Sequence, residues 1–138
     1  MLVFIILISC DPVDTRLKII NKSNSDIYFF YSCDSSLTNL KIFRNGYYSN
    51  SIGDSVYVTA DQIIKKHSRL NIGKRLGFGA WKSFVNSCPN QEINFYFFAD
   101  SIVNNFTDSE IKNLKLFEKH VSISLKDLKE NDWTIIYP

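Results

Sequence analysis

The chain has 138 residues, a formal net charge of +2 and an aromatic content of 14%, with 11 Phe and 7 Tyr. This length is typical of one domain that buries enough surface to fold without a metal. Acidic and basic residues are interspersed, which argues against nucleic acid as a partner, and we interpret the pairs Lys65–Lys66 and Lys74–Arg75 as solvated surface.

The first ten residues have the pattern of an export signal. Leu2 to Ile8 is an unbroken apolar run, too short for a spanning helix of roughly 20 residues but suited to a secretory signal core of about 7–15 residues. The sequence Leu7-Ile8-Ser9-Cys10 resembles the bacterial lipobox, in which the chain is cut before a cysteine that then carries lipid. A signal peptide normally begins with positively charged residues, but no Lys or Arg precedes this apolar run.

We therefore expect residues 1–9 to be a lipoprotein signal peptide, Cys10 to be lipidated and residues 10–15 to form a tether. The protein would then be attached to the membrane through its N-terminal lipid. The alternative is a buried N-terminal strand with a packed cysteine, which leaves the abrupt change to polar sequence after Cys10 unexplained.

Residues 16–138 are predicted to form a single mainly β domain. Two segments, 26–33 and 92–99, are apolar on both faces and read as central strands. The first strand, 16–21, is expected to form a hairpin with 26–33. Strands are predicted at 16–21, 26–33, 40–44, 55–59, 69–73, 92–99, 116–124 and 133–137, loops at 47–54 and 73–79, and either helix or strand at 60–67.

Three short helices are predicted from side-chain spacing and capping residues. Trp81, Phe84 and Val85 share one face of a helix over 80–86. Capping boxes at Thr107–Glu110 and Ser124–Asp127 each open a further helix, and Asn131 can end the last one in the left-handed conformation. The fold class is therefore an antiparallel β-sandwich-like domain with two or three short helices, with an α+β fold as the alternative.

Two cysteines remain if Cys10 carries lipid. In an exported protein Cys33 and Cys88 can pair in a disulfide. If segment 92–99 pairs antiparallel with 26–33, both cysteines lie at the same end of the strand pair. Two separate thiols, one buried and one in a loop, are the alternative.

No residue pattern indicates catalysis, a metal site or a cofactor. His67 and His120 lack a partner at ligand spacing. Glu118 and His120 would share one face of a strand, either as a small polar site or as an exposed pair on a solvated face. The segment Gly73–Gly79 lacks the residue order of a phosphate-binding loop.

Tyr47 and Tyr48 are the candidate ligand contacts, because tyrosine stacks on sugars and buries well at interfaces. They follow the turn Asn45–Gly46 and would act from a loop at 44–50, together with the loop at 73–80. The alternative is one tyrosine packed inward and one at the surface.

The C-terminal half, closing in Trp133-Thr-Ile-Ile-Tyr-Pro138, resembles a family of small uncharacterised lipoproteins of gut Bacteroidetes. The strand-turn-strand of 16–33 and the helix with Trp81 also fit, whereas residues 41–80 match poorly. The resemblance implies anchoring in the cell envelope, at the outer membrane, and no known activity.

Two further features fit such an envelope. Asp54-Ser55-Val56 and Asp100-Ser101-Ile102 resemble the O-glycosylation sequon of these bacteria, with Ser55 and Ser101 as acceptors. Asp11 and Asp14 resemble acidic surface-export signals, so the periplasmic and the surface face of the membrane both stay open.

The expected function is that of a non-enzymatic binding or structural module of the cell envelope. An accessory protein that recognises glycan or peptide is the first alternative. A small hydrolase is the second, and it would need His67 or His120 in a cleft beside a nucleophile.

Overall fold

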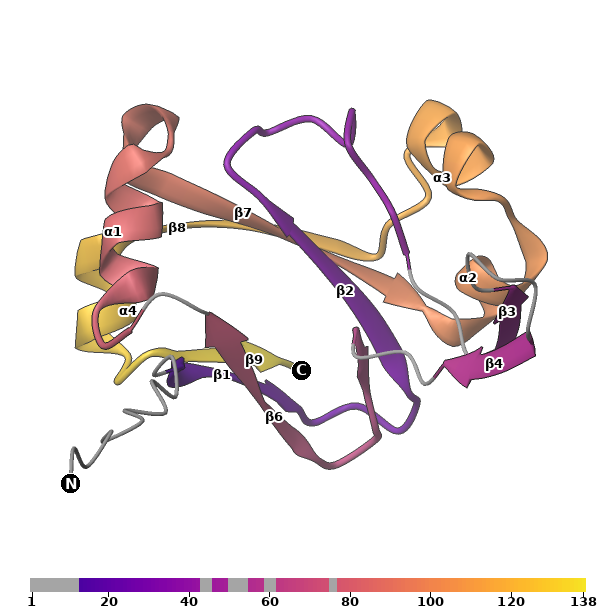
Figure 1. Cartoon of the computed structure of the whole chain (residues 1–138), viewed down its shortest axis with the longest axis horizontal. Coiled ribbons are helices and arrows are strands. Elements are labelled where there is room, and N and C mark those ends of the chain that lie inside the picture. Colours follow the sequence, from indigo (N-terminus) through magenta and orange to yellow (C-terminus); the bar gives the residue numbers. More distant parts are fainter. Residues whose placement is uncertain (1–12, 43–45, 50–54, 59–61, 75–76) are drawn as a thin grey trace, which may run out of the picture.

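The strands of this protein form two main sheets and one separate hairpin in the part of the chain that the structure describes (Figure 1). The computed structural model describes residues 13–42, 46–49, 55–58, 62–74 and 77–138. The elements are β1 (Asp14–Asn21), β2 (Ile27–Ser32), β3 (Gly46–Ser49), β4 (Ser55–Val58), β5 (Ile63–Ile64), β6 (Arg69–Lys74), α1 (Ala80–Ser87), β7 (Glu92–Ala99), α2 (Asp100–Asn105), α3 (Asp108–Leu114), β8 (Lys119–Ser124), α4 (Leu125–Glu130) and β9 (Thr134–Tyr137).

Sheet A has the strand order β6-β1-β9, and sheet B has the order β5-β2-β7-β8. Neighbouring strands are antiparallel except for β1 and β9, which run parallel. The predicted fold class, mainly β with short helices, is confirmed, and the parallel pair is a departure from the purely antiparallel expectation. Strands β3 and β4 pair only with each other among the described strands.

Sheet B is buried on both faces because its central strands are apolar at successive positions. Ile93, Phe95 and Phe97 of β7 face sheet A, whereas Tyr96 and Phe98 face the opposite way, as the period of two in a strand requires. The inner core, between the sheets, also contains Leu17, Ile19, Phe29, Trp81, Leu128 and Ile135. The outer core, on the other face of sheet B, also contains Tyr28, Leu37, Ile42, Val103 and Ile111.

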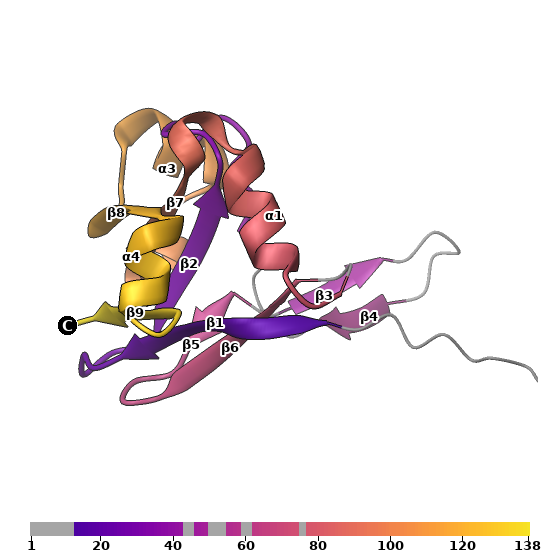
Figure 2. The same cartoon turned by 90° about the vertical axis from the view of Figure 1, so that its left-hand side faces the viewer.

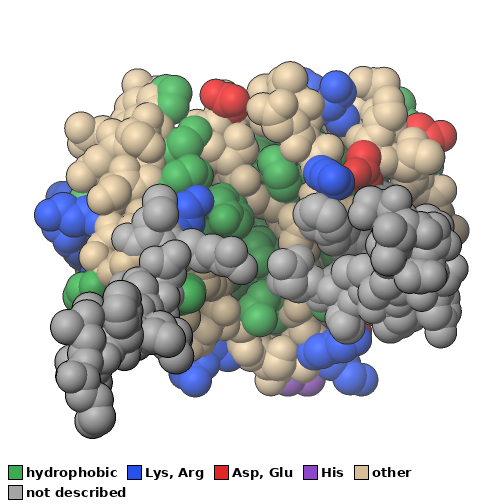
Figure 3. All heavy atoms as spheres, in the orientation of Figure 1, with side chains coloured by type: hydrophobic (Ala, Val, Ile, Leu, Met, Phe, Trp, Pro, Cys, Tyr) green, Lys and Arg blue, Asp and Glu red, His purple; other side chains and the backbone are tan. Residues whose placement is uncertain are grey.

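The four helices cover the ends of this arrangement. Figures 1 and 2 show α1 and α4 side by side at one end, where Trp81, Val85 and Leu128 enter the inner core. Helices α2 and α3 lie at the other end (Figure 1), where Val103 and Ile111 enter the outer core. Figure 3 shows apolar side chains reaching the surface in the middle of the face drawn in Figure 1, with lysine and arginine side chains scattered around them.

Both predicted capping boxes are confirmed. Thr107 opens α3 together with Glu110, and Ser124 opens α4 together with Asp127. The predicted left-handed end of α4 at Asn131 is wrong, since its φ is −95°. The left-handed turn lies instead at Asp132 and Trp133, with φ of 48° and 56°, where the Trp133 amide donates to the Leu128 carbonyl.

The predicted hairpin of 16–21 with 26–33 is also wrong. β1 pairs with β6 and β9, whereas β2 pairs with β5 and β7. The connection carries the chain from one sheet to the other, and buried Asn21 fixes it by donating from Nδ2 to the carbonyls of Ser25 and Ile64. A polar turn cluster alone does not distinguish such a crossing from a hairpin.

Several local predictions differ from the structure. Residues 40–42 form no strand and cover the outer core instead, where the Ile42 amide donates to Asp108 Oδ2. Residues 46–49, expected mostly as loop, form β3, and the ambiguous segment contains the short strand β5. Helix α2 was not predicted, although Asp100 gives its first turn the negative charge that a helix N-terminus favours.

Lys74 is not the solvated surface residue that the sequence analysis expected. Its ammonium lies 3.4 Å from the ring centroid of Phe84, 5.2 Å from that of Trp81 and 5.3 Å from that of Tyr31. Burial lowers the pKa of this amine. The lysine therefore packs as part of the contact between β6 and α1.

Asp14 joins sheet A to the N-terminus of α1. The helix has Gly79 at its N-cap and no capping side chain of its own. The buried Asp14 carboxylate takes this role by accepting hydrogen bonds from the backbone amides of Gly79 (3.1 Å) and Trp81 (3.2 Å). β1 thus begins two residues before the predicted start, at a residue expected to lie in the tether.

Arg16 holds the Asp14 carboxylate in place. Its Nε and its guanidinium NH2 group donate to the two carboxylate oxygens at 2.9 and 2.8 Å. The guanidinium also lies over the rings of Trp133 and Phe78, at 4.4 and 4.8 Å from their centroids. The hydrogen bond from Arg16, together with those from the backbone, lowers the pKa of Asp14 to about 2.

We predict that Asp14→Asn lowers the free energy of unfolding at pH 7 by about 2–3 kcal/mol, because an amide cannot accept this whole set of donors. The depressed pKa contributes stability above pH 3.8, the ordinary value, and this part is lost as the pH falls toward 2. Urea unfolding from pH 7 to pH 2 should therefore show the two proteins converging in acid.

Asp132→Asn is the matched control. Asp132 pairs with Lys18 from a side chain that is 90% exposed, so its loss should change stability by about 0.5 kcal/mol or less. An equal loss in both variants would contradict the role assigned to Asp14.

Candidate functional site

A disulfide joins Cys33 and Cys88, whose Cα atoms are 4.8 Å apart. Cys33 directly follows β2, and Cys88 follows α1 just before β7. The two strands pair antiparallel, the condition under which the sequence brings the cysteines together, with Ser32 opposite Asn94, so both cysteines lie at one end of the pair. The alternative of two separate thiols is therefore wrong.

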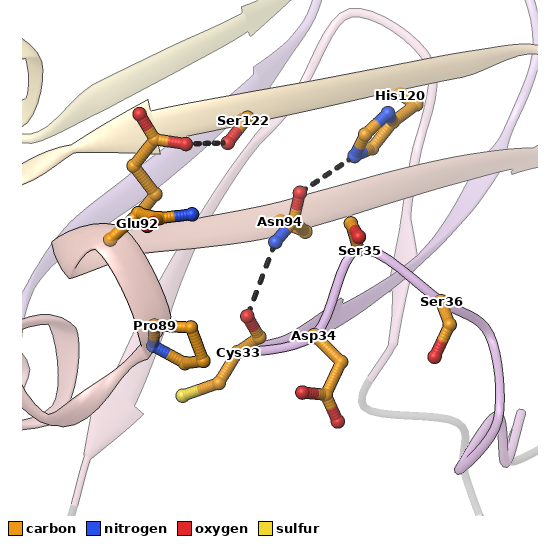
Figure 4. Close-up of a pocket in the computed structure, with 10 residues that line it drawn as sticks. Cys33, Asp34, Ser35, Ser36, Pro89, Glu92, Asn94, His120 and Ser122 are labelled. Atoms are coloured by element: carbon orange, nitrogen blue, oxygen red, sulfur yellow. Dashed lines mark hydrogen bonds between the residues drawn. The ribbon is translucent and has the colours of Figure 1, made fainter.

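Next to this disulfide, a polar groove crosses the outer face of sheet B. It consists of two adjoining hollows of about 410 and 370 Å³ that share Ser35, Ser36 and His120. We call the whole depression the His120 groove. The first hollow, drawn in Figure 4, is further lined by residues that include Cys33, Asp34, Asn90, Glu92, Asn94 and Ser122. The second is further lined by Leu37, Thr38, Tyr96, Lys112, Lys115 and Phe117.

Buried Asn94 orients His120. The Asn94 amide nitrogen donates to the Cys33 carbonyl at 3.4 Å, which leaves its oxygen to accept from His120 Nε2 at 2.8 Å (Figure 4). The proton of a neutral His120 therefore resides on Nε2, and Nδ1 is left as an acceptor. Desolvation lowers the pKa of His120, which favours this neutral ring.

Aromatic rings support His120 from the side of the outer core. Its ring stacks on Tyr96, with centroids 4.4 Å apart and planes inclined by 9°, and Phe117 meets Tyr96 edge-on at 5.4 Å. The Tyr96 side chain is 2% exposed, and its hydroxyl is buried without a hydrogen-bond partner in the described part of the chain. Burial raises the pKa of this phenol.

The two hollows differ in charge. The first contains the carboxyl groups of Asp34 and Glu92, the latter accepting from the Ser122 hydroxyl at 2.7 Å. The second contains the amines of Lys112 and Lys115, with no acidic side chain in its lining. A ligand lying along the groove would thus meet acceptors at one end and donors at the other.

The histidine pairings considered from the sequence do not form. Glu118 lies before β8 and accepts a hydrogen bond from Tyr137. Burial, together with this hydrogen bond, raises the pKa of Tyr137 to about 12. His120 instead faces Asn94 on β7. His67 is exposed in a turn, where Nε2 lies 3.1 Å from Asn24 Oδ1. Neither histidine is hydrogen-bonded to a hydroxyl or thiol in the described residues.

Several other predicted site residues lie partly or wholly outside the described residues. The backbone of Tyr47 and Tyr48 lies in β3, and that of Ser55 in β4, but their side chains are not described. Cys10 is also outside the described residues. Ser101 is exposed in the first turn of α2, where its predicted glycosylation stays a prediction.

Most residues of the groove were not predicted from the sequence. Asn94 could have been recognised, because it is an amide within an otherwise apolar strand. A buried polar side chain of this kind requires hydrogen-bond partners, which would have pointed to its neighbours. The loop residues Ser35 and Ser36 and the lysines after α3 carried none, because only the tertiary fold brings them to His120.

The described residues include no group of three or more His, Cys, Asp and Glu side chains that could hold a metal ion. Among the described helices, none is long and apolar enough to cross a membrane. Comparison of the chain with protein-family models, curated proteins and solved structures found no match.

The disulfide generates a stability prediction. It spans 55 residues, so replacing both cysteines, Cys33→Ser with Cys88→Ser, should cost about 4 kcal/mol in the chain-entropy description. Urea unfolding with and without reductant measures this. The parent protein should lose stability on reduction, whereas the double variant should be insensitive to reductant. A parent protein indifferent to reductant would show the bond to be dispensable.

Asn94→Asp should raise the pKa of His120 by about one unit or more, because a carboxylate beside Nε2 favours the charged ring. NMR titration of the imidazole Cε1–H resonance measures the pKa, which should lie below the ordinary 6.5 in the parent protein. Asn86→Asp, an exposed change on α1, is the control and should leave the His120 titration unchanged. The same result for both variants would mean that Asn94 does not orient His120 in solution.

Proposed function

We propose that this protein is a lipid-anchored, non-enzymatic binding module of the bacterial cell envelope, and that its ligand occupies the His120 groove. The observation that carries the proposal is the fixed polar wall of the groove. Asn94 is buried, both of its amide groups are hydrogen-bonded, and it presents His120 in one orientation beside a disulfide. A preorganised polar surface of this kind binds a ligand at low conformational cost.

Export and anchoring rest on independent features. Disulfides persist in oxidising compartments, so the Cys33–Cys88 bond supports an exported protein. The lipobox-like sequence up to Cys10 supports a lipid anchor at the outer membrane. Strand β1 begins at Asp14, and the three peptide units that join Cys10 to Val13 span at most about 11 Å. The folded domain would therefore lie close to the bilayer, whichever face of the membrane it occupies.

Binding is favoured over hydrolysis because, in the described residues, no hydroxyl or thiol is hydrogen-bonded to His120. Its Nε2 donates to Asn94, and the Ser122 hydroxyl donates to Glu92 instead. Nucleophilic catalysis by His120 would need a hydroxyl or thiol within hydrogen-bond reach of Nδ1.

Recognition of a glycan or peptide is the most specific form of this proposal. We place the ligand in the His120 groove and not at the two candidate loops, 44–50 and 73–80. The groove combines a stacked ring pair with hydroxyl and amide groups. Rings beside directional polar groups are the usual means of binding a sugar or an extended peptide.

Metabolic labelling with an alkyne fatty acid tests the anchor. The parent protein should be labelled and should fractionate with membranes, whereas Cys10→Ala should lose both properties, because the acylated thiol is absent. The Cys33→Ser/Cys88→Ser variant is the matched control and should keep the label. Unchanged labelling of Cys10→Ala would refute lipidation at this residue.

Screening the full chain on glycan and peptide arrays tests the groove. His120→Ala should weaken any hit at least tenfold, because it removes a ring and a directional polar group, and His67→Ala, on an exposed turn, should not. A hit that responds equally to both substitutions would place the ligand elsewhere. Circular dichroism of both variants would confirm that the fold is retained.

A further inference from the structure

We infer that the second hollow of the His120 groove is an oxyanion site, which holds a carboxylate or phosphate group of the ligand between Lys112, Lys115 and the Ser36–Thr38 hydroxyls. This inference rests on the proposed function, because it assigns the chemistry of the ligand to one end of the same groove.

Lys112 and Lys115 bring positive charge to this hollow. Lys112 lies in the last turn of α3, and Lys115 is the residue that caps it. Neither has an ion-pair partner among the described residues; ion pairs are formed by three other lysines, Lys18 with Asp132, Lys65 with Asp26 and Lys126 with Glu130. Two amines in one hollow without an acidic side chain create a positive local potential that attracts an anion.

Tyr96 also lines this hollow, and its hydroxyl has no hydrogen-bond partner in the described structure. A buried polar group of this kind is costly unless something satisfies it. Because the hydroxyl oxygen is itself buried, a ligand in the hollow would contact the ring of Tyr96 and not its hydroxyl.

A pair of hydroxyls lies on the loop that follows β2. Ser36 Oγ and Thr38 Oγ1 are 2.7 Å apart, so one of them donates to the other. The hydroxyl that accepts keeps its own hydrogen free for a ligand. The hollow therefore offers donors from α3 and from the loop, and the charge-assisted bonds from the two ammonium groups to an oxyanion are the strongest of these.

The lysines have a structural explanation that the experiment must separate from binding. Basic side chains at a helix C-terminus interact favourably with its dipole. α4 provides the matched comparison, since Lys129 lies in its last turn and Lys126 one turn earlier. If the dipole were the whole explanation, neutralising either pair of lysines would have similar effects on stability and none on binding.

The test is an NMR titration of the full chain, in neutral detergent micelles, with glucuronate, glucose 6-phosphate and glucose. The two acids distinguish a carboxylate from a phosphate ligand, and glucose is the neutral counterpart. We expect at least one acid to shift the resonances of 35–38, 112–117 and His120 with at least tenfold tighter binding than glucose. Raising the salt concentration should weaken this binding.

The variants give the decisive comparison. Lys112→Gln with Lys115→Gln should weaken binding of the acid at least tenfold. Lys126→Gln with Lys129→Gln should leave binding unchanged. Urea unfolding should show similar stability for both double variants, so a loss of binding would not reflect a loss of fold.

Two results would overturn the inference in different ways. If glucose binds the groove as well as the acids do, or the Lys112/Lys115 variant binds them normally, the oxyanion site is refuted while the binding module stands. If neither the acids nor the array ligands shift any residue of the groove, the inference and the proposed function fail together.

Discussion

Burial of sheet B on both faces is the constraint on which the rest of this structure depends. Because β7 packs against sheet A on one side and against α2, α3 and residues 37–42 on the other, nearly all its side chains are excluded from water. A polar residue in such a strand must have its hydrogen bonds supplied by the protein. Asn94 obtains them from Cys33 and His120, and the groove forms where those partners reach the surface.

The position of the groove also depends on sheet A, through α1. This helix ends at Ser87, and the disulfide cysteine Cys88 follows it directly. The position of the helix is fixed from sheet A by the Asp14 carboxylate, which replaces the missing N-cap side chain. The acidic residue that looked like part of an export signal is therefore a structural residue, and Arg16 keeps it charged in a buried position.

Local sequence patterns predicted the parts of the fold that local physics determines. Two runs apolar on both faces predicted the pairing of β2 with β7, and that pairing brought Cys33 and Cys88 to one end. Capping boxes predicted the starts of α3 and α4, since each consists of residues three positions apart. The partners of β1 could not be predicted, because buried Asn21 turns the chain from one sheet to the other through bonds to distant carbonyls. The packing of Lys74 could not be predicted for the same reason, since the rings that surround it come from two other elements, α1 and β2.

The choice of an amide as the partner of His120 fixes the direction of the ring without adding charge. A carboxylate at position 94 would stabilise the charged imidazolium and make the ring a stronger base, as the acidic member of a catalytic triad does. A neutral amide whose nitrogen is already bonded to a carbonyl can only accept from Nε2, so it fixes the tautomer and leaves the ring neutral. Desolvation against Tyr96 also favours the neutral ring. His120 is thereby held as a directional hydrogen-bonding group between an acidic and a basic hollow, with Nδ1 left as an acceptor.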